Sequence, residues 1–165
     1  MKFFFVVLLL SAILFLPACT QKSPNPVKGS YKKCTAYTYS YKLGKLDKKS
    51  KYKHKTYKYD SRGNKIEEVK YHSDGSMFDK YTFKYDSRGN MIEKVRYHSD
   101  GSINWKVTYK YDSRGNKIEE VWYHSKSSIF SKYIYKYDSR GNMIEKVEYD
   151  SLDKPKRKEE YIYSK

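Results

Sequence analysis

Cysteine is scarce in this chain of 165 residues, which contains Cys19 and Cys34 and no other. Cys19 follows the hydrophobic N-terminal run, so Cys34 has no partner and no disulfide framework can hold the fold. We interpret Cys34 as a small strand residue, because no histidine and carboxylate pattern marks it as a nucleophile. A glycine-rich phosphate loop, a histidine–cysteine cluster at metal-ligand spacing and a convergent carboxylate pair are also missing. We therefore expect no enzyme, no cofactor and no metal site.

Long hydrophobic runs are limited to one, the fourteen residues Phe3–Leu16. A helix needs about 20 apolar residues to cross a bilayer, so this run is typical of a signal-peptide core. It ends in Leu-Pro-Ala-Cys, which resembles the cleavage signal of bacterial lipoproteins. We predict a signal peptide over residues 1–18 and lipid attachment at Cys19, the alternative being ordinary cleavage near Ala18 with Cys19 incidental. Residues 19–30, rich in proline, serine and lysine, are expected to form a flexible tether.

Helix signals are absent from residues 31–165, where neither a 3.6-residue period nor capping patterns occur. An internal repeat is present instead. Tyr-Asp-Ser-Arg-Gly-Asn begins at Tyr59 and returns three times at intervals of 26 residues. Its aspartate and serine come early and its glycine late, which suits a type I turn that ends in a left-handed residue. The residues expected to make these turns are Gly63, Gly89, Gly115, Gly141, Asn64, Asn90, Asn116 and Asn142.

Strand-like segments separate the turns. Residues 103–111 alternate large apolar and polar side chains over nine residues, which predicts a half-buried strand. In the returning segment Ile66 and Val69 lie three apart, so a bulge after the glycine turn is needed to reconcile them. The short links leave no room for parallel crossovers. We predict an all-β fold for residues 31–165: an antiparallel meander of tandem hairpins, about ten strands in all, forming one twisted or rolled sheet.

One face of this sheet should be aromatic. Tyrosine suits a half-dry face, because its ring packs while its hydroxyl stays wet. The expected cross-strand ladders consist of Tyr81, Phe83, Tyr85, Trp105, Val107, Tyr109, Tyr111, Tyr133, Tyr135 and Tyr137.

The repeat Tyr-x-Tyr-Asp-x-x-Gly-Asn, as in residues 109–116, resembles the YD repeat of the Rhs and teneurin families. The match covers roughly residues 50–163 in four tandem copies. In the large relatives such repeats build a β-shell that encloses a toxin or forms a surface scaffold. A few repeats cannot wrap a shell, so the resemblance implies a small bacterial lipoprotein with a short YD-repeat array.

The formal net charge of +16 raises the question of a nucleic-acid partner. The predicted export signal argues against one, and part of the lysine excess has a local explanation. Lys84, Lys110 and Lys136 should face the glutamates of neighbouring strands. The surplus charge favours anionic partners such as surface glycans, with a protein partner as the alternative.

Candidate contact residues are few. Arg62, Arg88, Arg114 and Arg140 line one set of turns, either as a basic rim for anions or as exposed residues that keep the protein soluble. Trp122 is expected to point outward on a polar face, as a contact residue or packed under a loop. His72, His98 and His124 recur at the repeat period, but equivalent positions two strands apart are too distant to share one metal ion.

These observations predict a lipid-anchored protein of the bacterial cell envelope with a non-enzymatic binding or scaffolding role. They do not choose between the outer surface and the periplasmic face. The alternative is a periplasmic inhibitor or immunity-type protein, or an enzyme with an unrecognised site.

Overall fold

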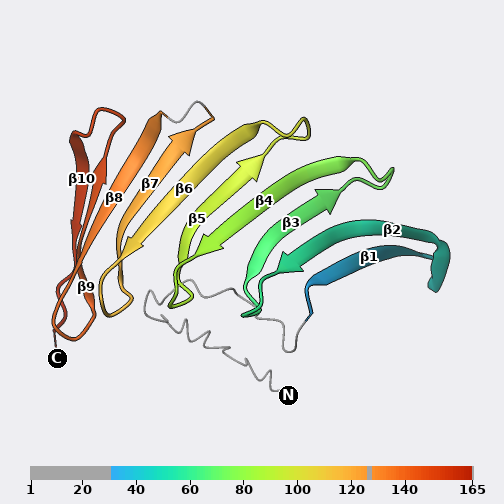
Figure 1. Cartoon of the computed structure of the whole chain (residues 1–165), viewed down its shortest axis with the longest axis horizontal. Helices are drawn as coiled ribbons and strands as arrows, with labels where there is room; N and C mark the ends of the chain where they lie inside the picture. Colours follow the sequence, from blue (N-terminus) through green and yellow to red (C-terminus); the bar gives the residue numbers. More distant parts are fainter. Residues whose placement is uncertain (1–30, 126–127, 165) are drawn as a thin grey trace, which may run out of the picture.

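The computed structural model describes residues 31–125 and 128–164, and these form one antiparallel sheet of ten strands (Figure 1). The predicted signal peptide, Cys19 and the tether lie outside the described residues. The strands follow one another in sequence order across the sheet, with β1 and β10 as its two free edges. Their bounds are β1 Lys33–Lys42, β2 Lys45–Tyr59, β3 Lys65–Tyr71, β4 Met77–Tyr85, β5 Met91–Tyr97, β6 Ile103–Tyr111, β7 Lys117–His124, β8 Ile129–Tyr137, β9 Met143–Tyr149 and β10 Pro155–Glu160.

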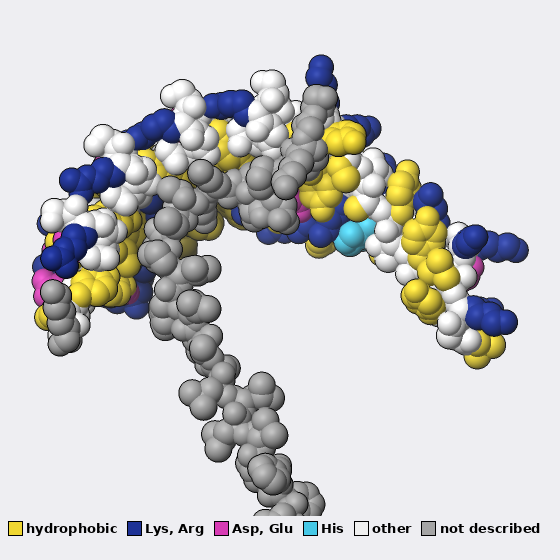
Figure 2. Space-filling view, turned by 90° about the horizontal axis from the view of Figure 1, so that it is seen from below, with side chains coloured by type: hydrophobic (Ala, Val, Ile, Leu, Met, Phe, Trp, Pro, Cys, Tyr) yellow, Lys and Arg dark blue, Asp and Glu magenta, His cyan; other side chains and the backbone are white. Residues whose placement is uncertain are grey.

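The predicted meander is confirmed, and the sheet curves strongly without closing. Seen end-on, it forms an arch (Figure 2). Strand twist explains the curvature, since a flat sheet of this width is unfavourable. Within the described residues each strand contacts the strands before and after it and no others. No helix suited to crossing a membrane is found in that part of the chain.

The repeated turns form as the sequence predicts. Gly63 adopts a φ of +81°, and Gly89, Gly115 and Gly141 adopt φ values of 87° to 90°. The backbone N–H of Asp60 donates to the carbonyl of Asn64 at 2.9 Å, and the N–H of Gly63 donates to the carbonyl of Asp60 at 3.1 Å. The hairpin of β1 and β2 has a shorter turn, between Lys42 and Lys45. Leu43 and Gly44 make it with φ values of +47° and +74°, as a two-residue hairpin turn requires.

The predicted bulge is also present, and it decides which side chains share a face. The register shifts between Lys84 and Tyr85, so that Tyr85 pairs with Met91 while Lys84 pairs with Glu93. Ile92 is the extra residue. After it, Glu93 and Val95 lie on the opposite face from Lys94, because side chains alternate along a strand.

One face, here called the aromatic face, carries the predicted tyrosine and tryptophan ladders. Its centre is a cluster of Phe83, Met91, Val107 and Tyr109, and Val107 is fully buried. Tyrosine hydroxyls link each repeat to the previous one across this face. The Oη atom of Tyr111, for example, donates to the carbonyl of Met91 at 2.8 Å. The same bond recurs from Tyr85 to Lys65, from Tyr137 to Lys117 and from Tyr163 to Met143.

The other face, here called the lysine face, carries the predicted ion pairs. Lys84 pairs with Glu93 at 2.8 Å, and Lys110 with Glu119 at 2.8 Å. Equivalent pairs join Lys58 to Glu67 and Lys136 to Glu145. The small aliphatic residues Val69, Val95 and Val121 are buried on this face.

The expectation that Trp122 points outward on a polar face is wrong. Trp122 is the cross-strand partner of Val107, and it packs against the central cluster of the aromatic face. Trp122 and Val121 lie on opposite faces, because side chains alternate along a strand. Val121 pairs with Thr108 on the lysine face, which places Trp122 on the aromatic face.

Candidate functional site

The aromatic face is hollowed by a groove of about 470 Å³ that runs across β3, β4, β5 and β6. This volume falls within the range of small-molecule sites, about 300–1,000 Å³. The residues that line it are Lys65, Glu68, Lys70, Tyr81, Phe83, Tyr85, Met91, Lys94, Trp105 and Tyr109. None of these was predicted as a site residue from the sequence.

Three of the four charged residues that line the groove, all but Lys70, come from two positions that vary between repeats. The first holds Lys65, Met91, Lys117 and Met143, and the second holds Glu68, Lys94, Glu120 and Lys146. The bulge brings the two positions onto the same face, so Lys65 Nζ lies 2.6 Å from Glu68 Oε2. Lys117 pairs with Glu120 in the same way. Where methionine replaces the first lysine, lysine replaces the glutamate, and the internal pair is lost.

Lys94, at the centre of the groove, is the lysine that replaces the glutamate of this pair. Its Nζ atom lies 5.4 Å from the ring centroid of Tyr81 and 5.4 Å from that of Trp105. No ion pair among the described residues includes Lys94. Burial lowers the pKa of Lys94, and the positive charges of Lys65 and Lys70 lower it further, while the negative charge of Glu68 opposes them in part. The groove thus holds a half-buried ammonium group that lies over aromatic rings and makes no ion pair with the described residues.

Two more lysines approach aromatic rings of the groove. Lys70 Nζ lies 5.1 Å from the ring centroid of Tyr81, and Lys65 Nζ lies 4.9 Å from that of Phe83. Three lysines therefore surround one carboxylate, Glu68. This arrangement gives the groove a positive potential over an apolar floor, which favours an anion with an apolar body.

The tyrosines of the groove act as neutral hydrogen-bonding groups. Burial, with a smaller effect of Asp60, raises the pKa of Tyr85 to about 12. Burial also raises the pKa of Tyr109, which Glu120 raises further. Both phenols stay protonated at neutral pH, so neither serves as a nucleophile or general base there.

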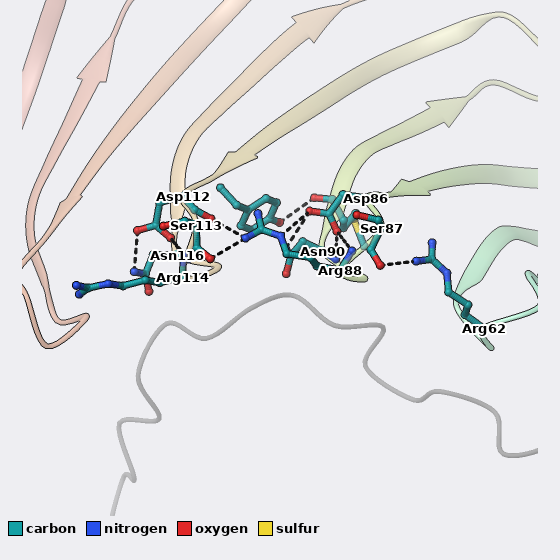
Figure 3. A network of polar contacts seen from close by, with 11 residues as sticks. Arg62, Asp86, Ser87, Arg88, Asn90, Asp112, Ser113, Arg114 and Asn116 are labelled. Carbon is teal, nitrogen blue, oxygen red and sulfur yellow. Dashed lines mark hydrogen bonds and ion pairs between the residues drawn. The ribbon is translucent and has the colours of Figure 1, made fainter.

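Three of the four turn arginines make contacts that the sequence did not predict. Arg62, Arg88 and Arg114 each donate from Nη1 to backbone carbonyls of the next turn, as Figure 3 shows for Arg62 and Arg88. Arg88 reaches the carbonyls of Asp112 and Ser113 at 3.0 and 2.9 Å. Arg62 donates to Ser87 and Arg114 to Ser139. These three arginines, here called the arginine column, therefore join consecutive repeats through the turns at one end of the strands.

We expect Arg88→Ala to lower the free energy of unfolding by about 1 kcal/mol, because two partly exposed hydrogen bonds are lost. Arg140→Ala is the matched control. Arg140 holds the same turn position, and among the described residues its guanidinium makes no hydrogen bond. Urea denaturation followed by circular dichroism measures both variants, and the control should stay within about 0.5 kcal/mol of the parent. Equal effects of the two substitutions would contradict the linking role.

The turn asparagines clamp the aspartates that shape the turns. Asn90 donates from its backbone N–H to Asp86 Oδ1 at 2.8 Å and from Nδ2 to Asp86 Oδ2 at 3.0 Å. Arg88 adds a backbone N–H at 2.9 Å. The same bonds recur in the other three copies. The carboxylate therefore accepts three hydrogen bonds in its charged form, which it would lose on protonation.

This clamp predicts a pH dependence of stability. Burial alone would raise the pKa of Asp86, but the hydrogen bonds from Asn90 and Arg88 outweigh it and lower the pKa. The pKa of Asp138 is lowered chiefly by the side chain of Asn142. A carboxylate whose pKa is lowered on folding stabilises the folded state. This contribution is complete above the ordinary aspartate pKa of about 3.9, and it is lost as the pH falls through the pKa of the folded state.

We therefore expect the melting temperature to fall steeply below about pH 4. Melting curves measured by circular dichroism between neutral and acidic pH test this. Asp86→Asn, which removes the titrating group, should have a lower melting temperature at neutral pH and a shallower fall. A flat profile in the parent would show that the turn carboxylates do not contribute.

Each histidine of the repeats contacts the residue six positions later. The ring centroids of His72 and Phe78 lie 4.9 Å apart, and those of His124 and Phe130 lie 5.0 Å apart. At the equivalent place Asn104 bonds to the ring of His98 at 2.9 Å. In the described ranges no three metal-binding side chains converge. Cys34 is an exposed residue of β1.

No protein-family model matches the chain, and the comparison with curated proteins finds no match. Solved structures with a similar strand arrangement include a protein of unknown function from Bacteroides fragilis, with 14% identity, a TM-score of 0.41, and 78% of this chain and 93% of that chain covered. The Tc holotoxin pore of Photorhabdus luminescens matches with 13% identity and a TM-score of 0.37, over 74% of this chain and 8% of that chain. A complex of TcdB2 and TccC3 without its hypervariable C-terminal region matches with 13% identity and a TM-score of 0.26, over 75% of this chain and 9% of that chain. TM-scores below 0.5 assign neither a function nor a partner to this chain.

Proposed function

We propose that this protein is a small YD-repeat lipoprotein of the bacterial cell envelope, and that its aromatic face is a non-enzymatic binding surface. The observation that supports the binding role most is the groove around Lys94. A half-buried lysine that makes no ion pair within the described part of the chain, over two aromatic rings, is poorly explained by stability alone, because burial opposes its charge. An anionic ligand would supply the missing partner.

The anchoring role is supported by the sequence Leu-Pro-Ala-Cys after the hydrophobic run. A lipid at Cys19 and a tether over residues 19–30 would hold the sheet near a membrane while leaving the groove accessible. In this arrangement the arginine column and the tyrosine bonds keep the sheet in one shape. Anionic surface glycans and a protein partner both remain compatible with the charge of the groove, and a nucleic acid is not proposed.

The anchoring prediction is tested with Cys19→Ser. The parent should partition with membranes, and the variant, which lacks the thiol that receives the lipid, should appear in the soluble fraction. Ala18→Gly, which keeps a small residue before the cysteine, is a control that should stay with the membranes. Unchanged membrane partitioning of Cys19→Ser would refute lipid attachment at this residue.

Protease treatment of intact cells then tests the location. Loss of the protein from intact cells would support a role at the outer surface. Survival on intact cells, with loss after lysis, would refute the surface role and favour the periplasmic inhibitor or immunity-type protein.

A further inference from the structure

The groove differs from the equivalent site two repeats later in the partner of its central lysine. Lys146 holds the repeat position of Lys94, and its Nζ atom lies 5.3 Å from the ring centroid of Tyr133, as Lys94 lies over Tyr81. Lys146 has a carboxylate, Glu159, at 3.8 Å. Among the described residues Lys94 makes no ion pair, although the charge of Glu68 acts on it from a greater distance. The repeat therefore provides one lysine with an ion-pair partner and one that has none among the described residues.

Lys94 is surrounded by groups that suit one kind of anion. Lys65 and Lys70 line the same groove and add positive charge. Glu68 lies among them, with its carboxylate bonded to Lys65 at 2.6 Å. A ligand that carried negative charge alone would be repelled by Glu68, whereas a ligand with hydroxyl groups beside its charge could donate to it.

The rings of the groove favour a saturated ring over a nucleobase. Lys94 lies over Tyr81 and Trp105 at 5.4 Å from each centroid, and Lys70 lies over Tyr81 at 5.1 Å. Base stacking needs an open aromatic face, which these ammonium groups occupy. An anionic sugar instead brings its carboxylate to the ammonium groups and packs its C–H edges against the remaining ring surface.

We propose that the groove binds a carboxylate-bearing glycan: the carboxylate of one uronic-acid residue is held by Lys94 and Lys70, and a neighbouring hydroxyl donates to Glu68. This inference rests on the proposed binding function and names its ligand class. The aromatic face continues beyond the groove through Trp122, which lies 5.3 Å from Trp105 between ring centroids, toward β8. Further sugar residues of the same chain lie along this extension.

Tryptophan fluorescence is a direct probe, because the chain contains two tryptophans and Trp105 lines the groove. The full-length protein in detergent is titrated with an oligogalacturonate, with galacturonic acid, with neutral maltohexaose and with oligothymidylate. We expect saturable, salt-sensitive binding of the oligogalacturonate and no response to maltohexaose. The monosaccharide should bind more weakly than the oligomer, and equal affinity would overturn the extension along the face.

Lys94→Met should weaken oligogalacturonate binding about tenfold to a hundredfold, since a charge-assisted hydrogen bond is lost. Lys146→Met makes the same substitution at the paired site and should change the affinity by less than about twofold. Lys70→Met is the second test if Lys94→Met does not fold. Equal losses in Lys94→Met and Lys146→Met, or tighter binding of oligothymidylate than of oligogalacturonate, would overturn the proposal. Absence of oligogalacturonate binding would also overturn it, and would leave the membrane test of Cys19 unaffected.

Discussion

Val107→Asp is expected to lower the free energy of unfolding by about 3–5 kcal/mol, because the desolvation of a buried carboxylate outweighs its attraction to a neighbouring lysine. Val107 lies at the centre of β6 with no exposed surface. Its cross-strand partners are Lys94 on β5 and Trp122 on β7. A carboxylate at this place is desolvated beneath the tryptophans, and pairing with Lys94, which is itself half-buried, does not offset that cost. Small domains are stable by about 5–15 kcal/mol, so the loss is a large fraction of the total.

Urea denaturation monitored by far-ultraviolet circular dichroism measures this loss. Ile103→Asp is the control, because it adds the same charge to the same strand at a residue that is 38% exposed. Its effect should stay near 0.5 kcal/mol. Val107→Ala should give an intermediate loss, since it removes buried methyl groups without adding a charge. A parent-like midpoint for Val107→Asp would mean that the centre of the aromatic face is wet.

The sequence predicts most of this fold because each repeat contains signals for both its turns and its strands. Glycine at positive φ, aspartate at the turn start and alternating side chains agree in every copy, and ten strands in sequence order follow from the short links. The pairing of Lys84 with Glu93 also follows, because the two residues lie near one turn and one bulge separates them. Local signals of this kind can be read from the sequence without knowledge of the tertiary contacts.

The groove could not be predicted in the same way, because its residues depend on where the bulge lies. The extra residue Ile92 sends Lys94 to the aromatic face, whereas a regular strand from Met91 onward would send it to the lysine face. The pattern of residues 65, 68 and their repeats was visible in the sequence as an alternation between copies. In one type of copy a lysine pairs with a glutamate, and in the other a methionine and a lysine replace them. Only the strand register shows that these two positions lie on one face and can form such a pair.

The same register explains why one repeat carries two tryptophans. Val107 holds the position that Tyr81 and Tyr133 hold in the adjacent copies, and valine leaves space on the aromatic face. Trp105 and Trp122 cover that space, with ring centroids 5.3 Å apart at an angle of 48°. The small residue and the two large ones therefore form one packing unit, which differs from its neighbours in composition while keeping the same backbone.

Trp122→Ala is accordingly expected to lower the free energy of unfolding by about 2–3 kcal/mol, somewhat below the range for fully buried tryptophan because the ring is half-buried. The substitution uncovers Val107 and removes the hydrogen bond from Trp122 Nε1 to Glu120 Oε1 at 2.6 Å. Trp122→Phe should recover most of the loss. Phe130→Ala, at a residue that is 59% exposed, is the matched control and should change stability by about 0.5 kcal/mol.

These variants separate packing from recognition at Trp122. If the ring serves as part of the central cluster, Trp122→Ala shifts the urea midpoint, and the fluorescence of the remaining Trp105 moves to longer wavelength as water reaches it. A residue that served as an outward contact alone would leave both unchanged. Among the described residues no second sheet packs against the aromatic face, so the rings that fill its centre also form the surface that a ligand meets. A stability loss at Trp122, together with weaker binding of the oligogalacturonate, is therefore the result that the continuity of groove and core predicts.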